Sequence, residues 1–135
     1  MEEHCERVVS ILDDDESVRR SVGSLLSSVG LVVAAFDSAE SFLCSGLLES
    51  TGCLVLDLQM PGMDGLGLLA HLSKTGARIP AVILTAHGDD PARQRAMQAG
   101  AVAFVDKPFV SAELIGAVRS ALQRSSGGLS SVYNQ

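Results

Sequence analysis

The sequence predicts an α/β fold with an open, doubly wound sheet of five parallel strands and helices on both faces. Short β-branched apolar runs alternate with longer segments of helical period along the 135 residues. This order favours parallel strands that are joined by crossover helices. Four of the five runs are almost continuously apolar, which is typical of strands that are covered on both faces.

The elements are assigned in order from these runs and from the residues that end helices. We predict strands at residues 8–12, 31–36, 53–56, 81–84 and 102–105. We predict helices from 17 to 29, from after Ser38 to near 46, from 65 to about 75, from after Asp90 to near 100 and from 111 onward. Ser38 suits an N-cap, Asp90 precedes a proline at the first helical position, and Gly30, Gly76 and Gly100 suit C-caps.

The composition predicts one soluble, cytoplasmic domain. A hydrophobic content of 47% and a charged content of 19% exclude a disordered chain. The net charge of -6 disfavours direct binding to nucleic acid, whose phosphates it would repel. No apolar run approaches the ~20 residues of a membrane span, and the acidic start MEEHCER is unlike a signal peptide.

The cysteines and the last residues bear on compartment and domain boundaries. Cys5, Cys44 and Cys53 are odd in number and lack CxxC spacing, which disfavours disulfides or zinc and favours a reducing compartment. We expect Cys44 and Cys53 to pack in the core.

We place the domain at residues 1–124 and interpret residues 125–135 as a flexible tail or the start of a linker to an output domain absent from this chain.

Polar residues follow the apolar runs at the ends where open α/β sheets bind ligands. They are Asp13, Asp14 and Asp15 after the first run, Asp57 after the third, Thr85 after the fourth, and Asp106, Lys107 and Pro108 after the fifth. Carboxylates gathered at one edge repel each other unless a cation neutralises them. Because all the candidate ligands are oxygens, we expect a hard divalent cation, and Mg²⁺ is the first choice.

Four separated segments resemble the receiver domain of bacterial two-component response regulators. They are LDDDESVRRSV at 12–22, LVLDLQMPGMDGL at 54–66, ILTAHGD at 83–89 and AGAVAFVDKPF at 99–109. The last two are similar to the FixJ-type subgroup in particular. The resemblance runs from residue 8 to about residue 124 and implies a flavodoxin-like sheet with the strand order 2-1-3-4-5.

The resemblance implies a phosphoryl-acceptor site. Asp57 would attack the phosphorus of a phosphohistidine and form an acyl phosphate. Asp14, Asp57 and the backbone carbonyl of Gln59 would bind Mg²⁺, and Asp13 would act mostly through a bound water. Thr85 and Lys107 would contact phosphoryl oxygens.

It also implies a conformational switch. Thr85 would move toward the phosphoryl group, and Phe104, at the family's switch aromatic position, would fill the space that it leaves. The face formed by the fourth helix, the fifth strand and the fifth helix would then change shape. A cis peptide is expected between Lys107 and Pro108.

Some roles stay open. Gln59 and His87 could tune the attack of water on the phosphoryl group, although His87 could equally be an exposed loop residue. Asp15 has no role that the sequence assigns. Arg19 and Arg20 are interpreted as solvated or facing a partner.

The preferred hypothesis is a signalling switch that catalyses its own phosphorylation and dephosphorylation and is not a turnover enzyme. A haloacid-dehalogenase-type phosphatase needs an acid two residues after the nucleophile, and here that residue is Gln59. A flavin-binding domain of the same topology would place a phosphate near Asp13 and Asp14, which would repel it. A degenerate receiver that needs no phosphate is a third alternative, disfavoured because every expected site residue is present.

The expected partners follow from the switch hypothesis. A sensor histidine kinase would dock near the first helix and the loop before the last one. An output domain outside this chain would be a DNA-binding domain, and phosphorylation could produce a homodimer. Neither nucleic acid nor a membrane is expected to bind these residues directly.

Overall fold

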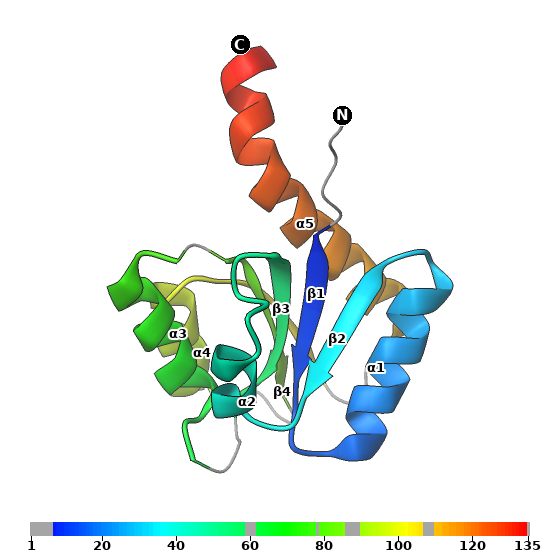
Figure 1. Cartoon of the computed structure of the whole chain (residues 1–135), viewed down its shortest axis with the longest axis vertical. Helices are drawn as coiled ribbons and strands as arrows, with labels where there is room; N and C mark the ends of the chain where they lie inside the picture. The colour runs from blue at the N-terminus through cyan, green and yellow to red at the C-terminus, as the bar shows by residue number, and fades with distance from the viewer. Residues whose placement is uncertain (1–6, 59–61, 78, 86–89, 107–109, 135) are drawn as a thin grey trace.

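Strands and helices alternate along the chain as the sequence predicts (Figure 1). The computed structural model describes residues 7–58, 62–77, 79–85, 90–106 and 110–134, apart from the side chains at 90, 92 and 124–134. The elements are β1 (Val8–Leu12), α1 (Glu16–Ser28), β2 (Val32–Phe36), α2 (Ala39–Cys44), β3 (Thr51–Asp57), α3 (Gly65–Thr75), β4 (Ala81–Thr85), α4 (Asp90–Gln98), β5 (Ala101–Asp106) and α5 (Ser111–Asn134).

The five strands form one parallel sheet in the order β2-β1-β3-β4-β5, which confirms the predicted topology. The chain moves outward from β1 to β2 on one side and from β3 to β5 on the other. The order therefore reverses between β1 and β3, where such sheets place their ligands. Leu12 pairs with Leu56 in the register of these two strands, so the residues that follow them, Asp13 and Asp57, leave the sheet side by side.

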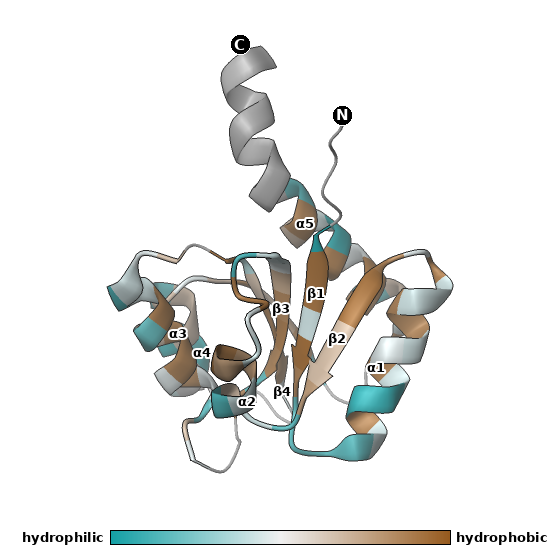
Figure 2. Ribbon diagram, in the orientation of Figure 1, coloured by the Kyte–Doolittle hydropathy of each residue, from teal (hydrophilic) through white to brown (hydrophobic). Residues whose placement is uncertain are grey.

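The sheet separates two apolar layers because successive side chains of a strand point to opposite faces. In β3, Leu54 and Leu56 pack with residues of α2, α3 and α4. Cys53 and Val55 pack on the opposite face with residues of α1 and α5. Figure 2 shows the strands mostly brown, the apolar end of the scale, with a pale band in the middle of β1. Burial on both faces explains the continuous apolar sequences of the central strands β3 and β4, whereas β2, at the edge of the sheet, has exposed residues.

Glycines follow two helices, and a serine precedes a third, at the predicted positions. Gly30 and Gly76 adopt φ values of +88° and +83°, which are the left-handed conformations expected after a helix. The Ser38 hydroxyl accepts a hydrogen bond from the backbone N–H of Ser41 at 3.1 Å and so caps α2. Helix α4 begins at Asp90 itself, one residue earlier than the Asp90-Pro91 pair indicates.

Helix α5 continues to Asn134 and projects beyond the sheet (Figure 1). Residues 125–134 are therefore helical where we expected a flexible tail. Once a helix is nucleated, each further residue adds a hydrogen bond, and no proline interrupts this segment. The domain boundary at residue 124 stays a prediction. None of the helices within the described residues is long and apolar enough to cross a membrane.

The two described cysteines are free thiols in different environments. Cys53 is buried as predicted, and desolvation raises the pKa of its thiol from 9.0 to about 12. Cys44 is exposed, so its predicted place in the core is wrong. Helix α2 has six residues and buries Ala39 and Phe42, and a residue two positions after Phe42 points away from that face.

Candidate functional site

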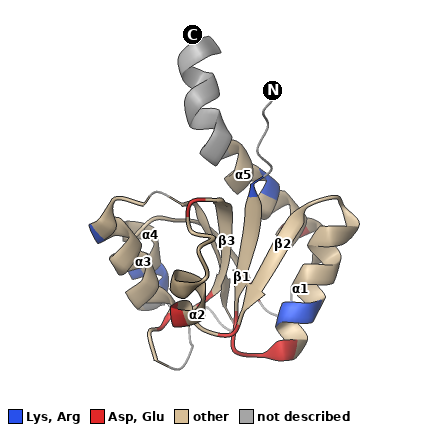
Figure 3. Cartoon of the chain, viewed as in Figure 1, with Lys and Arg blue, Asp and Glu red and all other residues tan. Residues whose placement is uncertain are grey.

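Three carboxylates meet at the end of the sheet where β1 and β3 finish. One carboxylate oxygen from each of Asp13, Asp14 and Asp57 lies within 4.8 Å of the others. Figure 3 shows acidic residues at this edge, below the strands. The parallel register of β1 and β3 produces the cluster, since it brings two residues 44 positions apart in sequence to neighbouring strand ends. The structure thus brings together the three acids that the sequence places at this edge.

The three acids differ in exposure. Asp13 is fully buried, Asp57 is partly buried, and Asp14 is exposed. A buried carboxylate is unfavourable unless hydrogen bonds or a cation compensate. Asp13 Oδ1 accepts a hydrogen bond from the backbone N–H of Asp15 at 2.9 Å, which fixes the orientation of that carboxylate. The cluster thus combines oriented, partly desolvated oxygens with one solvent-accessible side, as a hydrated divalent cation requires.

Arg19 supports the segment that carries the first two acids. Its Nη1 donates a hydrogen bond to the backbone carbonyl of Asp13 at 2.7 Å, and the side chain is partly buried. Arg19 is therefore held in part by this contact within the chain, and its interpretation as facing a partner stays a prediction. Helical spacing places residue 19 one turn after the start of α1, on the side that faces back to the strand end.

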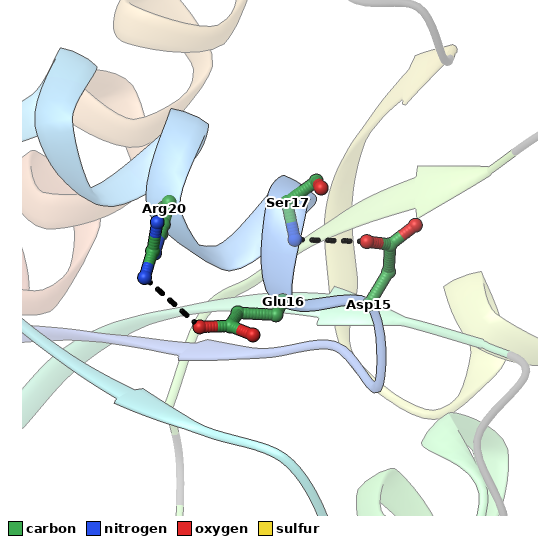
Figure 4. Close-up of polar contacts among 4 residues, drawn as sticks. All are labelled: Asp15, Glu16, Ser17 and Arg20. Carbon is green, nitrogen blue, oxygen red and sulfur yellow. Dashed lines mark hydrogen bonds and ion pairs between the residues drawn. The ribbon is translucent and has the colours of Figure 1, made fainter.

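Asp15 caps α1, a role that the sequence did not assign. Its carboxylate accepts a hydrogen bond from the backbone N–H of Ser17 at 2.9 Å (Figure 4). Helix α1 therefore starts at Glu16, one residue before the predicted start. In the next turn, Arg20 pairs with Glu16 at 3.1 Å, and both side chains are exposed (Figure 4). An acid directly before a helical period is the signal that could have identified this cap.

Gly65 brings the start of α3 against the backbone of the central acid. Its N–H donates to the carbonyl of Leu58 at 3.0 Å. A Cβ at this position would lie 2.7 Å from the backbone oxygen of Asp57 and 2.8 Å from Cα of Leu58. Only glycine allows this approach.

Glu40 reaches the loop after β3 from α2. Its Oε2 accepts a hydrogen bond from the backbone N–H of Met63 at 3.0 Å, next to Gly62, which has φ +76°. The contact joins residues 23 positions apart. Local sequence signals do not report contacts of this kind, and Glu40 was missed.

Thr85 and Phe104 occupy neighbouring strands on the face that α4 covers. Thr85 ends β4 and is 8% exposed, and Asp106 of β5 is its register partner. Phe104 pairs in register with Ile83 and is partly buried. These positions agree with the predicted switch pair, whose motion stays a prediction.

Four predicted residues, Gln59, His87, Lys107 and Pro108, lie outside the described residues. The Mg²⁺-binding carbonyl, the tuning residues, the phosphoryl-binding lysine and the cis peptide therefore stay predictions.

Comparison with known proteins agrees with this geometry. The family model for the response regulator receiver domain matches residues 9–119. The transcriptional regulatory protein FixJ of Azorhizobium caulinodans is 45% identical over 117 residues, covering 87% of this chain and 56% of FixJ. The response regulator protein TodT of Pseudomonas putida is 45% identical over 116 residues, covering 86% of this chain and 51% of TodT.

Solved structures give the same result. The crystal structure of FixJ-N matches with a TM-score of 0.79 and 39% identity, covering 91% of this chain and 96% of that one. The structure of the response regulator StyR matches with a TM-score of 0.86 and 42% identity, covering 96% of this chain and 66% of that one. The chain spans about half the length of the curated relatives it matches. With five parallel strands in the order 2-1-3-4-5 and three acids at their switch point, the chain belongs to the response regulator receiver domain family.

Proposed function

We propose that Asp57 accepts a phosphoryl group from the phosphohistidine of a sensor kinase, with Mg²⁺ bound among Asp13, Asp14 and Asp57. The observation that carries this proposal is the convergence of three carboxylate oxygens within 4.8 Å of one another. Three negative charges at this separation repel each other, and a divalent cation between them removes that penalty.

The donor set fits Mg²⁺ better than a softer metal. The cluster offers carboxylate oxygens from Asp13, Asp14 and Asp57, and Mg²⁺ prefers a few carboxylates completed by waters. The exposed side at Asp14 leaves room for those waters and for a phosphoryl oxygen. Gln59, as a further ligand through its carbonyl, is part of the proposal. When bound, Mg²⁺ would offset the repulsion between Asp57 and the incoming phosphoryl group.

The transfer step follows from the placement of Asp57. A carboxylate oxygen of Asp57 attacks phosphorus in line, a P–O bond forms, and the P–N bond to the kinase histidine breaks. The imidazole leaves with the electron pair of that bond and takes up a proton from solvent. Thr85, almost buried at the end of β4, would donate its hydroxyl to a phosphoryl oxygen, and Lys107 would pair with another.

The output follows from the added charge. The acyl phosphate carries about -2 where the carboxylate carried -1. Thr85 would move toward it and Phe104 would turn into the space vacated, which changes the face of α4, β5 and α5. FixJ and TodT are named as regulators, and we propose that this domain likewise controls a transcriptional output domain, with dimerisation through the changed face. On this proposal it is a switch that catalyses its own phosphorylation and dephosphorylation.

The kinase would bind near α1 and the loop before α5, and the reaction would take place in the cytoplasm. The free thiols of Cys44 and Cys53 agree with a reducing compartment.

Incubation with acetyl phosphate and Mg²⁺, followed by intact mass measurement, tests the proposal. We expect one added phosphoryl group in the wild type, none in Asp57→Asn, and none when Mg²⁺ is chelated. Asp37→Asn is the matched control, because Asp37 is an exposed aspartate that precedes α2 at the same edge, and it should be phosphorylated as the wild type is. Phosphorylation that persists in Asp57→Asn or without the metal would contradict the proposal. Sustained release of phosphate from small esters would favour the phosphatase alternative.

A further inference from the structure

Arg93 of α4 contacts two residues of β5 with one guanidinium group. Its Cζ lies 5.0 Å from the centroid of the Phe104 ring, within the range of a cation–π contact. Its Nη2 donates to Oδ1 of Asp106 at 2.9 Å. Phe104 and Asp106 are two positions apart on one strand, so both side chains face α4. Arg93 thus covers the aromatic ring and joins α4 to the end of β5.

The two residues that Arg93 contacts are paired in the sheet with residues of β4, one of which is Thr85, the proposed switch residue. Phe104 is the register partner of Ile83, and Asp106 is the register partner of Thr85. Any inward motion of the Phe104 ring toward Thr85 therefore removes the ring from under the guanidinium. Within the residues described, no element other than α4 supplies a cation to this ring.

The guanidinium is not fully satisfied in this arrangement. The Nε atom of Arg93 is buried, and no acceptor in the described part of the chain is within hydrogen-bonding distance. A buried donor without an acceptor is unfavourable. The unpaired Nε therefore offsets part of the free energy that the ion pair and the ring contact contribute. A two-state switch needs such a small difference between its states.

We propose that Arg93 is a positioning residue that holds Phe104 and the end of β5 in the unphosphorylated arrangement, and that loss of its contacts shifts the domain toward the phosphorylated one. This role rests on the function proposed above. It assigns to α4 an active part in the resting state, since the helix holds the ring through Arg93.

The direction of the effect follows from linkage. A contact made in only one of two states stabilises that state, and its removal raises the population of the other. A ligand that binds the phosphorylated arrangement then binds more tightly, because less free energy is spent on the change. We expect Arg93→Ala to bind a phosphoryl mimic about fivefold more tightly, which corresponds to about 1 kcal/mol at 1.4 kcal/mol per tenfold.

The test is a titration of beryllofluoride in the presence of Mg²⁺, followed by NMR of ¹⁹F-labelled phenylalanine. The chain has four phenylalanines, and Phe104→Leu assigns the signal of Phe104. We expect tighter binding in Arg93→Ala and, without Mg²⁺ or beryllofluoride, a Phe104 signal moved toward its position in the bound wild type. Arg93→Lys keeps the charge but lacks the planar group that stacks on the ring, so its signal should move in the same direction. Arg95→Ala removes an exposed arginine of the same helix and should change neither readout.

Equal or weaker binding by Arg93→Ala, or an unmoved Phe104 signal in the free protein, would overturn the role of Arg93. If the wild type does not bind beryllofluoride, the proposed function fails, and the Phe104 signal of the free variants still decides whether Arg93 holds the ring. Should Arg93→Ala fail to fold, Asp106→Asn removes the ion pair and leaves the ring contact. It should shift both readouts in the same direction by a smaller amount, and a shift in the opposite direction would count against the proposal.

Discussion

Glu40 at the start of α2 accepts a hydrogen bond at 3.0 Å from the backbone N–H of Met63, in the loop that follows Asp57. The carboxylate approaches this loop beside Gly62, where a Cβ would lie 3.0 Å from its Oε2. One side chain of α2 thus holds the chain segment that connects the acidic cluster to α3. On the proposal that Mg²⁺ binds this cluster, we expect its affinity to depend on Glu40, which is not one of the proposed ligands.

We expect Glu40→Ala to weaken Mg²⁺ binding about two- to fivefold, or roughly 0.4–1 kcal/mol, because the loop loses the acceptor that orients it. Glu40→Gln keeps an acceptor oxygen and removes the charge, so it separates orientation from electrostatic attraction. Titration of Mg²⁺ by calorimetry measures both. A Glu40→Gln variant as weak as Glu40→Ala would show that charge, and not the hydrogen bond, is responsible.

Removal of one acid from the cluster should stabilise the protein when no metal is present. Asp14 is exposed and lies with Asp13 and Asp57 in a group of like charges, whose mutual repulsion is about 1 kcal/mol or more at such separations. We expect Asp14→Asn to raise the free energy of unfolding by about 1 kcal/mol in metal-free buffer. Mg²⁺ should stabilise the wild type strongly and the variant weakly.

Urea unfolding with and without Mg²⁺ checks this prediction. Glu49→Gln is the control, since Glu49 is an exposed acid before β3, away from the carboxyl ends of the strands. A metal-free Asp14→Asn protein less stable than the wild type would show that the acids are held by attractive contacts instead.

The cap of α1 can be removed without touching the cluster. Asp15→Ala deletes the acceptor for the backbone N–H of Ser17, and loss of an N-cap costs about 1 kcal/mol. Asp15→Asn retains a good cap and should be nearly as stable as the wild type. Thermal or urea unfolding measures the difference. Phosphorylation by acetyl phosphate should survive both changes, and its loss in Asp15→Asn would place Asp15 in the chemistry.

Cys53 and Cys44 should differ in reactivity. Burial raises the pKa of Cys53 to about 12, and the thiolate is the reactive form. Iodoacetamide at about pH 8.5 should therefore modify Cys44 in the native protein and Cys53 only after unfolding. Peptide mass spectrometry identifies the modified residue, and rapid native labelling of Cys53 would contradict its burial.

The same pKa predicts a dependence of stability on pH. In the folded protein the thiol of Cys53 keeps its proton to higher pH than it does in the unfolded chain. Its contribution to the free energy of unfolding is therefore complete below about pH 9 and is lost as the pH rises toward about 12. The free energy of unfolding of the wild type should fall more steeply over this interval than that of Cys53→Ala. Cys44→Ala should follow the wild type.

The centre of the sheet could be predicted because β3 and β4 are buried on both faces and therefore have nearly continuous apolar sequences. The start of β3 is the exception. Thr51 is buried, and its hydroxyl lies 2.8 Å from that of Ser10 and donates to the carbonyl of Leu47 at 2.7 Å. A polar residue satisfied in this way carries no apolar signal, so β3 begins two residues before the predicted strand.

The acidic cluster could be predicted from topology, because parallel strands deliver their last residues to one edge. The contacts that support it could not. Arg19 and Glu40 each bond a backbone group outside their own helix, and Arg93 contacts two residues of β5. A charged residue on a helix has the same local sequence signal whether it is solvated or makes such a contact. The prediction that Cys44 is buried failed for a related reason. A six-residue helix is too short for its sequence period to indicate which side chains face the core.

At Gly65 the backbone of α3 lies directly against the backbone of Asp57, with no side chain between them. A single methyl group added at residue 65 would displace the backbone of the acid or push α3 outward, although it would alter neither the charge nor the identity of any ligand. On the proposal that Asp57 accepts the phosphoryl group beside Mg²⁺, the spacing between acceptor and metal depends on the absence of a side chain at residue 65. Gly65→Ala would thus change the position of Asp57, although the substituted residue lies eight positions away in the sequence.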